Sequence, residues 1–378
     1  MSCSFSSICG GCSFRDLTLQ EYRQQKVKQV QNVLQLITRR NFSFSEPIFA
    51  ADGTRRRAAF TFARHKGNLV LGFNAAKSHE IVDINACSLL TSEINSALPT
   101  IRDLLQKITS TEIISGKRKS RKVSCIDKGD VWVTQAENGL DLVLEFDCEI
   151  NLDIRQIIFE VMSNQDSIIR VSHRKNFGTA AETLIEKIKP YISVAGRNVY
   201  IPAGTFLQPS KDGEQALIGL VLKYLDGISG NIADLFCGVG TFSYAISQLD
   251  GCRVTAVDSS APLLSGFRDS LNRQMISNVE ILNRNLFKYP LTGKELAVFD
   301  AIVFDPPRAG AKEQVRAIAE LPTTSKPQKI VAVSCNPDTF VRDAEILNSG
   351  GYELVEVTVV DQFIYSPHCE LVALFNKI

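Results

Sequence analysis

The sequence predicts a two-part α/β protein whose C-terminal half is a doubly wound, mostly parallel β-sheet. In that half, near-continuous apolar segments such as NIADLF, RVTAVD and KIVAVSC alternate with helical stretches. This alternation is typical of parallel sheets covered by helices on both faces. The last two apolar segments, residues 352–360 and 370–376, have no helix between them. We therefore expect them to form an antiparallel pair at one edge of the sheet.

The N-terminal half has the pattern of an α+β module. Thr18 and Glu21 have the spacing of a capping box, and Val27, Val30 and Leu34 then recur at helical spacing. Short apolar segments follow, together with one further helical stretch near residues 91–108. The expected strands are residues 58–62, 69–73, 131–134 and 141–146.

These changes of pattern divide the 378 residues into a cysteine loop with its helix (1–44), an α+β module (45–200) and an α/β sheet domain (201–378). The composition, 44% hydrophobic and 22% charged, excludes disordered, collagen-like and rod-like proteins. No uncharged apolar run reaches the ~18 residues of a membrane-spanning helix, and the polar N-terminus lacks a signal-peptide pattern. We expect a monomeric cytoplasmic protein with no membrane partner.

The net charge of +1 conceals a basic N-terminal region. Residues 1–126 hold 19 lysines and arginines against 9 acidic residues, and two dense basic clusters stand out. Such a bias indicates a surface for a polyanion such as a nucleic acid; the alternative is that the clusters are solvated loops. The first cluster is Arg55, Arg56, Arg57, Arg64 and Lys66, and the second is Lys117, Arg118, Lys119, Arg121 and Lys122.

Four of the ten cysteines have the spacing of a metal-binding set. Cys3, Cys9 and Cys12 form a C-x5-C-x2-C loop around two glycines, and Cys87 is a distant fourth thiol. A tight glycine turn can direct three thiols at one point, and the fourth completes four-coordination. Such a set suits either a [4Fe–4S] cluster or a structural zinc ion.

A candidate nucleoside-binding loop follows the first strand of the C-terminal sheet. Gly238 and Gly240 let the chain turn sharply at the carboxyl edge, and Asp258 ends the next strand, where a carboxylate can accept hydrogen bonds from ribose hydroxyls. Both a nicotinamide dinucleotide and S-adenosylmethionine (SAM) fit this pattern. Tyr244 stands near the position of the third dinucleotide glycine, which favours a nucleoside without a pyrophosphate.

Three further loops at the same edge carry reactive side chains. Asp305 begins the stiff DPPRAG loop, Cys335 lies in SCNP just before a helix, and Glu370 opens the last strand, two residues after His368. A helix N-terminus lowers the pKa of a thiol, so Cys335 is a candidate nucleophile. Glu370 is a candidate general base. The alternatives are a core cysteine and a hydrogen-bonded acid at a strand end.

The same segments, taken together, are the CGGC loop, GTFLQPS, DLFCGVGTF, VTAVD, LNRNLF, DPPRAG, SCNPDTFVRD and HCE. In this order they resemble the SAM-dependent RNA uracil-5-methyltransferase family, in particular its iron–sulfur branch, which acts on 23S ribosomal RNA. The resemblance implies a C-terminal Rossmann-like class I SAM-methyltransferase domain. It also implies an α+β RNA-binding domain that carries a [4Fe–4S] cluster.

The resemblance further implies roles for individual residues. Cys335 would add to C6 of a uridine as nucleophile, and Glu370 would remove the C5 proton as general base after methyl transfer from SAM. Phe206 would lie near the target base of the RNA. The [4Fe–4S] cluster would be held by Cys3, Cys9, Cys12 and Cys87. The SAM pocket would be lined by Gln208, Phe236, Thr241, Asp258, Asn285 and Asp305.

Two alternative functions remain open from the sequence. A tRNA uracil-5-methyltransferase acting on the T-loop uridine would share all of the proposed chemistry. A non-catalytic RNA-binding protein, with a structural zinc ion and a degenerate nucleotide fold, would share the cysteines and the basic clusters.

Overall fold

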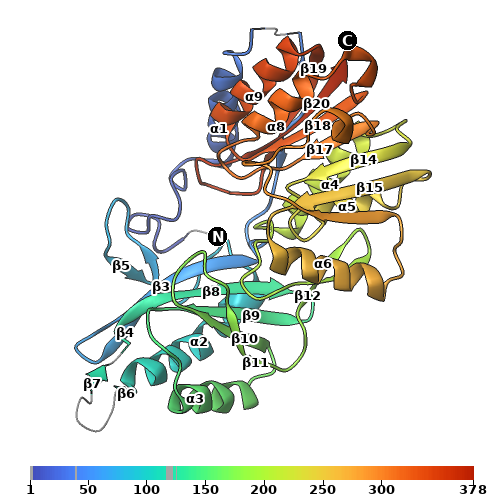
Figure 1. Ribbon diagram of the computed structural model, residues 1–378. Coiled ribbons are helices and arrows are strands. Elements are labelled where there is room, and N and C mark those ends of the chain that lie inside the picture. The colour runs from blue at the N-terminus through green and yellow to red at the C-terminus, as the bar shows by residue number, and fades with distance from the viewer. Residues whose placement is uncertain (1–2, 39–40, 116–121, 125) are drawn as a thin grey trace. The chain divides into compact units, whose positions relative to one another are not determined.

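The computed structural model describes residues 3–38, 41–115, 122–124 and 126–378, and it divides into two compact units (Figure 1). We call them the N-unit and the C-unit and describe each by itself. The N-unit comprises Met1–Arg15, Ala51–Ile192 and Ile201–Ser210, and the C-unit comprises Asp16–Ala50, Ser193–Tyr200 and Lys211–Ile378.

This division differs from the three sequence segments 1–44, 45–200 and 201–378, because packing groups stretches that are distant along the chain. The cysteine loop belongs to the N-unit, whereas the helix after it buries Val30 and Leu34 in the core of the C-unit. The stretch 201–210 belongs to the N-unit, where Arg55 forms an antiparallel bridge with Ser210.

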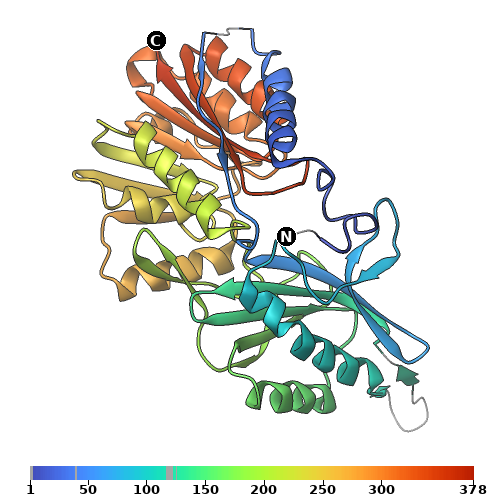
Figure 2. The same ribbon diagram turned by 180° about the vertical axis from the view of Figure 1, so that it is seen from behind.

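The N-unit is a mostly antiparallel sheet with two helices, α2 and α3, on one face (Figures 1 and 2). The strand order is β11-β10-β9-β8-β3-β4-β5, and β9 and β10 pair in parallel. The four strands and the helix near residues 91–108 that the sequence predicts for this unit are confirmed. The elements of this sheet are β3 (Arg57–His65), β4 (Asn68–Asn74), β5 (Ile81–Asp83), α2 (Ser92–Ser110), β8 (Lys128–Ala136), β9 (Gly139–Glu145), α3 (Leu152–Ser163), β10 (Ile168–Arg174) and β11 (Glu182–Glu186).

Two further pairs of strands in the described ranges lie outside the large sheets. They are β6 (Ile113–Ser115) with β7 (Lys122–Ser124), and β12 (Tyr191–Val194) with β13 (Arg197–Tyr200). Among the described residues, no helix combines the length and the apolar character that a membrane crossing needs.

The C-unit is an α/β sheet whose strand order is β1-β19-β20-β18-β17-β14-β15-β16, with β2 also paired to β19. Strands β14 to β18 run parallel, and β20 is antiparallel to both neighbours, as the sequence predicts. The strands are β1 (Ser43–Phe44), β2 (Ile48–Phe49), β14 (Gly230–Leu235), β15 (Cys252–Asp258), β16 (Val279–Asn283), β17 (Ala301–Phe304), β18 (Lys329–Ser334), β19 (Tyr352–Asp361) and β20 (Glu370–Lys377).

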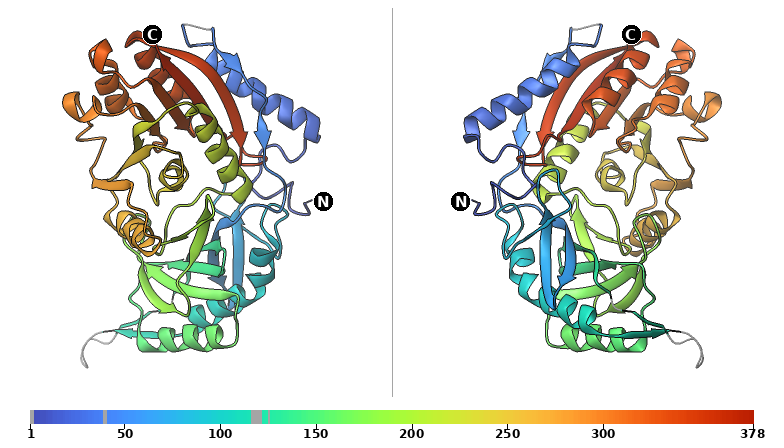
Figure 3. Two further views of the ribbon diagram at one scale, coloured as in Figure 1. Left: turned by 90° about the vertical axis from the view of Figure 1, so that its right-hand side faces the viewer. Right: turned by 90° about the vertical axis from the view of Figure 1, so that its left-hand side faces the viewer.

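Helices lie on both faces of this sheet. They are α1 (Leu19–Leu34), α4 (Lys211–Tyr224), α5 (Thr241–Ile246), α6 (Ala261–Arg273), α7 (Gly293–Leu296), α8 (Lys312–Ala319) and α9 (Pro337–Ser349), with a 3-10 turn at Thr323–Ser325. Thr18 and Glu21 form the expected capping box of α1. Figure 3 shows the blue N-terminal part of this unit beside the red C-terminal strands, where β1 and β2 pair with β19.

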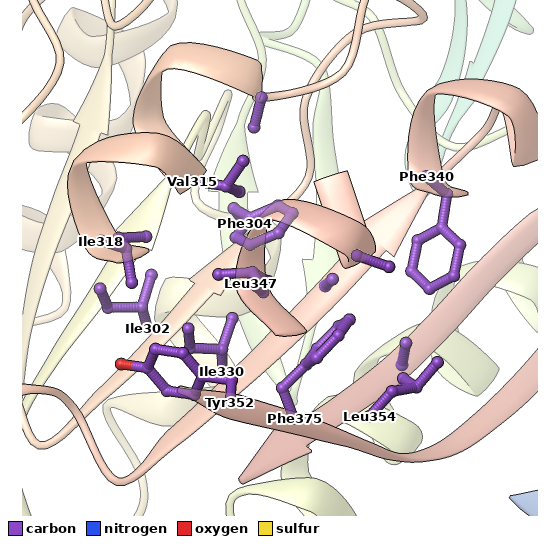
Figure 4. Packing of buried hydrophobic residues seen from close by; sticks show 14 of the residues in the cluster. Ile302, Phe304, Val315, Ile318, Ile330, Phe340, Leu347, Tyr352, Leu354 and Phe375 are labelled. Atoms are coloured by element: carbon purple, nitrogen blue, oxygen red, sulfur yellow. The ribbon is translucent and has the colours of Figure 1, made fainter. Parts of the chain in front are cut away.

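The core of the C-unit fixes the sheet against α8 and α9 (Figure 4). Ile302 and Ile330 from the central strands meet Val315 of α8, Leu347 of α9 and Phe375 of β20, and all five are fully buried. Each such side chain contributes about 1.5–3 kcal/mol by leaving water. The strand order reverses between β14 and β17, and ligands of open α/β sheets bind at the carboxyl edge of such a reversal.

Candidate active site

The loop after β14 turns sharply at the carboxyl edge of the sheet. Phe236, Gly238 and Gly240 have φ angles of 63°, 56° and 89°, in the left-handed region that favours glycine. A side chain at Gly240 would lie 2.4 Å from the ring of Phe267, so only glycine fits there. The buried carboxyl of Asp234 accepts a hydrogen bond from Ser243 Oγ at 2.5 Å, which ties the strand to α5.

Asp258 ends β15 and anchors this loop. Its Oδ2 accepts from the backbone N–H of Gly238 at 3.0 Å, and its Oδ1 accepts from the N–H of Ser260 at 2.8 Å. A carboxylate oxygen can accept more than one hydrogen bond. Asp258 can therefore bind ribose hydroxyls while it keeps both backbone bonds.

Two aromatic rings lie in the loops that follow β14 and β16. The rings of Phe236 and Phe287 lie 5.3 Å apart, and Phe287 is 46% exposed. Asn285 holds the turn that presents Phe287, because its Oδ1 accepts from the N–H groups of Phe287 and Lys288 at 3.1 and 3.2 Å. These bonds leave the Asn285 side-chain NH2 unused. Phe287 is not among the residues that the sequence predicts for the site, although it is the last residue of LNRNLF.

Asp305 follows β17 next to the glycine loop, and its N–H donates to the carbonyl of Leu235 at 3.2 Å. Burial raises the pKa of its carboxyl to about 7. The DPPRAG loop is fixed behind it, because the N–H of Ala311 donates to Asp343 Oδ2 at 2.7 Å. A carboxyl group with this pKa is ready to ionise when a cation binds beside it.

Cys335 follows β18 on a loop that is tied to the DPPRAG loop. The side chain of Asn336 accepts from the N–H of Asp338 at 3.1 Å, which caps α9, and donates to the carbonyl of Arg308 at 3.1 Å. Thr339 Oγ1 donates to the same carbonyl at 3.3 Å. These hydrogen bonds join the loop that carries Cys335 to the loop that begins with Asp305.

Glu370 neighbours Cys335 across the antiparallel pair of β18 and β20. Ser334 pairs with Leu371. Cys335, the residue after Ser334, therefore faces Glu370, the residue before Leu371. Glu370 is 3% exposed, and its Oε1 accepts from Gln362 Nε2 at 3.3 Å. Burial, reinforced by the charge of Asp305, raises the pKa of Glu370 well above its ordinary value.

The expectation of a lowered thiol pKa at Cys335 is wrong. Burial raises the pKa of Cys335 to about 12, and the negative charges of Glu370 and Asp305 add to the rise. These effects exceed the opposing influence of a hydrogen bond from the backbone of Cys335 and of the charge of Arg308, both of which lower the pKa. The resting site therefore holds a protonated thiol.

His368 is placed by Arg308, whose Nη2 lies 2.9 Å from its Nδ1. Burial and the charges of Arg308 and Lys26 lower the pKa of the imidazole.

Thr241 is the first residue of α5, directly after Gly240. The C-unit thus brings together the following sequence-predicted residues: Phe236, Thr241, Asp258, Asn285, Asp305, Cys335 and Glu370.

The other two predicted ligand-binding residues, Phe206 and Gln208, belong to the N-unit. Arg57 Nη1 donates to the carbonyl of Leu207 at 2.8 Å, and Arg56 Nε donates to that of Gln208 at 3.0 Å. The loop is therefore fixed by arginines, with Gln208 buried and Phe206 62% exposed.

These bonds correct the interpretation of the first basic cluster. Arg56 is 5% exposed, and Arg64 Nη1 donates to the carbonyl of Thr109 at 2.7 Å. All four arginines of this cluster, Arg55 included, thus donate to carbonyl groups within the N-unit, rather than forming a solvated loop or an open polyanion surface. The cluster Lys117, Arg118, Lys119 and Arg121 lies outside the described residues, as does the side chain of Lys122.

The four cysteines of the predicted metal set gather within the N-unit. Burial raises the pKa of Cys12 to about 11, and the nearby thiols of Cys87, Cys9 and Cys3 add to the rise. Four thiols close enough to interact electrostatically are a donor set that suits a metal. Within the described part of the chain, however, they do not adopt a metal-binding arrangement.

The cysteine loop is held in place by backbone contacts. The N–H of Gly10 donates to the carbonyl of Asn74 at 2.9 Å, and a side chain at Gly10 would lie 2.8 Å from that oxygen. The N–H of Cys87 donates to Asn95 Oδ1 at 2.9 Å. Glycine is therefore required for the close approach of the loop to the end of β4.

Comparison with known proteins places this site in a family. Residues 156–378 match the family model described as tRNA (Uracil-5-)-methyltransferase. An uncharacterized RNA methyltransferase of Agrobacterium fabrum is 37% identical and covers 98% of this chain and 83% of its own length. A 23S rRNA (uracil(1939)-C(5))-methyltransferase of Pectobacterium atrosepticum is 28% identical and covers 99% of this chain and 79% of its own.

A solved structure has the same fold. The Pyrococcus abyssi tRNA (uracil-54, C5)-methyltransferase in complex with S-adenosyl-L-homocysteine matches with a TM-score of 0.72 and 21% identity, over 97% of this chain and 84% of its own. The expected class I SAM-methyltransferase fold is thereby confirmed. The family match spans more than half of the chain, and the enzymatic relatives exclude the non-catalytic alternative. This chain belongs to the RNA uracil-5-methyltransferase family, whose members are SAM-dependent enzymes.

Proposed function

We propose that this protein transfers the methyl group of SAM to C5 of a specific uridine in 23S ribosomal RNA, with Cys335 as nucleophile and Glu370 as general base. The observation that carries the proposal is the pairing of β18 with β20, which sets the thiol beside a buried carboxyl group. A nucleophile next to a base is what covalent catalysis on a pyrimidine ring requires. The activity would be cytoplasmic.

The steps follow from the chemistry of uracil, whose C5 is a weak nucleophile. The Cys335 thiolate adds to C6, which makes an enolate with negative charge on C5 and O4. SAM, when bound, supplies the electrophilic methyl group that C5 takes up. Glu370 then accepts the C5 proton, and the C5–C6 double bond forms again as the thiolate leaves C6. The target base must be unpaired or flipped out of its stack.

The raised pKa values restrict when this chemistry can start. In the resting site burial keeps protons on Cys335 and on Glu370. A cationic ligand beside Asp305 favours the ionised forms of the neighbouring acids. The thiolate is therefore expected to form only after the site is filled, which protects the cysteine from side reactions.

The C-unit carries the groups that would hold SAM. Asp258 would accept from the ribose hydroxyls, Phe236 and Phe287 would contact the adenine, and Asn285 would offer its free NH2. Thr241 and Asp305 lie at the same edge, and we include Gln208 of the N-unit in the binding set. The fit is supported by the left-handed backbone at Gly238, which leaves room for a ligand at the turn.

The choice of 23S RNA is supported by the relative from Pectobacterium atrosepticum, which matches 99% of this chain and is named for that substrate. A tRNA target is the second candidate, since the family model and the Pyrococcus abyssi protein are named for tRNA. Methylation of 23S transcripts and of tRNA by the purified protein with labelled SAM distinguishes them. Preferential labelling of tRNA would contradict the proposal.

The proposal includes a [4Fe–4S] cluster on Cys3, Cys9, Cys12 and Cys87, supported by the gathering of four thiols in the N-unit. Protein purified without oxygen should be brown, with absorbance near ~400 nm and about four irons per chain. One zinc ion per chain in colourless, active protein would contradict this. No step above needs an electron, so the cluster would support folding or RNA docking.

A further inference from the structure

A buried lysine of α1 lies outside the site described so far. Tyr22, Lys26, Val30 and Leu34 recur every four residues and form the buried stripe of α1, and Lys26 is only 1% exposed. An apolar residue would continue this stripe, whereas a buried ammonium group is costly unless it is paired and hydrogen-bonded. The partners of Lys26 therefore indicate what its charge does.

These partners lie at the end of β19 and in the connection between β19 and β20. Lys26 Nζ lies 3.0 Å from Asp361 Oδ1 and donates to the carbonyl of Ser366 at 2.5 Å and to that of His368. Asp361 is the last residue of β19 and is fully buried. The ammonium group thus donates two hydrogen bonds and forms one ion pair, with partners that run from the end of β19 to the end of the connection.

Tyr22, one turn earlier on α1, also forms hydrogen bonds with Asp361 and with the connection. Its hydroxyl donates to Asp361 Oδ2 and accepts from the N–H of Tyr365 at 2.9 Å. The rings of Tyr22 and Tyr365 lie 4.8 Å apart. The helix therefore fixes the backbone of this connection at several points within the C-unit, where the N-terminal and C-terminal parts of the chain lie side by side (Figure 3).

Glu370 is the residue that this connection leads into. His368, whose carbonyl Lys26 binds, stands two residues before Glu370, and Cys369 between them is buried. Gln362, which donates to Glu370, follows directly after Asp361. Both the backbone before Glu370 and its hydrogen-bond donor are thus attached to groups that Lys26 holds.

We infer that Lys26 is a positioning residue that sets Glu370 in place to remove the C5 proton. The inference rests on the proposed function. Lys26 touches no reacting atom, and its effect passes through the backbone of residues 366–368 and through Asp361. Removing it should slow the step that uses Glu370 while sparing the earlier addition of Cys335 to the uridine. A residue that only stabilised the fold would affect all steps alike.

The experiment compares the two steps in single turnovers. RNA tritiated at C5 of uridine reports proton removal, and methyl-labelled SAM with a denaturing gel reports the protein–RNA adduct. Lys26→Met leaves the buried Asp361 unpaired and can unfold the chain. The test variant is therefore Lys26→Met combined with Asp361→Asn, which removes both charges. Lys28→Met, on the exposed face of α1, is the matched control.

The double variant should form the methylated adduct at close to the wild-type rate. Tritium release and adduct decay should then be about tenfold slower or more, as for a misplaced catalytic group. Wild-type decay in a folded double variant, or equal slowing of adduct formation and decay, would overturn the inference. Failure of the proposed function itself would look different: neither the wild type nor Glu370→Gln would form an adduct.

Discussion

The guanidinium group of Arg57 lies over the ring of Phe206, 4.8 Å from its centroid. The same arginine binds the carbonyl of Leu207, so the loop and its exposed ring are held by one side chain. Burial lowers the pKa of Arg57 to about 10, and the neighbouring Arg56 and Arg55 add to this effect. Arg57 therefore remains charged at neutral pH and holds the exposed ring of Phe206, on which we propose that a base of the RNA stacks.

Replacing Phe206 by Ala should weaken RNA binding by about 1–3 kcal/mol, the usual contribution of one base stacked on an aromatic ring. Because the side chain is 62% exposed, the free energy of unfolding should change by about 0.5 kcal/mol or less. Titration of RNA and thermal unfolding measure the two effects. Phe159→Ala, at a 61% exposed position on α3, is the matched control. Equal RNA affinity of both variants would contradict the role of Phe206.

SAM binding should strengthen as the pH rises from 6 to 8. Burial raises the pKa of Asp305 to about 7, and a sulfonium cation is attracted by the ionised carboxylate, so protonation competes with binding. The affinity should increase up to about tenfold over this range and level off above it. Calorimetry in buffers of different ionisation enthalpy should detect proton release. Asp305→Asn should bind weakly at every pH; an unchanged pH profile in this variant would assign the proton elsewhere.

Asp305→Asn should also stabilise the unliganded protein at pH 8. An acid whose folded-state pKa is raised favours the protonated form, so its contribution to stability falls as the pH rises from its unfolded value near 4 through about 7. Removing the charge should raise the free energy of unfolding by on the order of 1 kcal/mol at pH 8 and by less at pH 5. Denaturant unfolding at both pH values measures the difference. A variant less stable than the wild type at pH 8 would contradict it.

The cluster at residues 117–122 should contribute to RNA binding through phosphate contacts. Changing Lys117, Arg118, Lys119, Arg121 and Lys122 to Ala should weaken RNA binding and flatten its salt dependence by up to about one unit per lost contact. SAM affinity should stay the same. Binding measured at several salt concentrations tests this, and an unchanged slope would mean that the cluster is a solvated loop.

The sequence predicts the fold well because periodic apolar segments decide it. The parallel strands, the antiparallel pair at the C-terminus and the capping box at Thr18 all follow from local patterns. The very short strands β1 and β2 do not, because two residues carry no periodicity and only their pairing with β19 defines them.

The sequence predicts that Asp258, Asp305 and Cys335 lie at the ends of strands, and the structure has them there. The site was not predictable where a charge is used inside the protein. Arginine and lysine usually lie at the protein surface. Only the folded chain shows that Arg56 and Lys26 are buried and donate hydrogen bonds to carbonyl groups. The rise in the pKa of Cys335 also depends on its burial, and then on two carboxyl groups that are distant in sequence.

The division of labour between Cys335 and Glu370 is tested most directly by the fate of the covalent adduct. Cys335→Ala should abolish methyl transfer and leave SAM binding largely intact. In Glu370→Gln, Cys335 should still add to C6 and C5 should still be methylated. Elimination should then stall, because the C5 proton is not removed. A denaturing gel should then show a slow-migrating protein–RNA band that needs both SAM and Cys335, and the double variant should show none. Normal turnover of Glu370→Gln without an adduct would contradict the account, and His368 would be the next base to test.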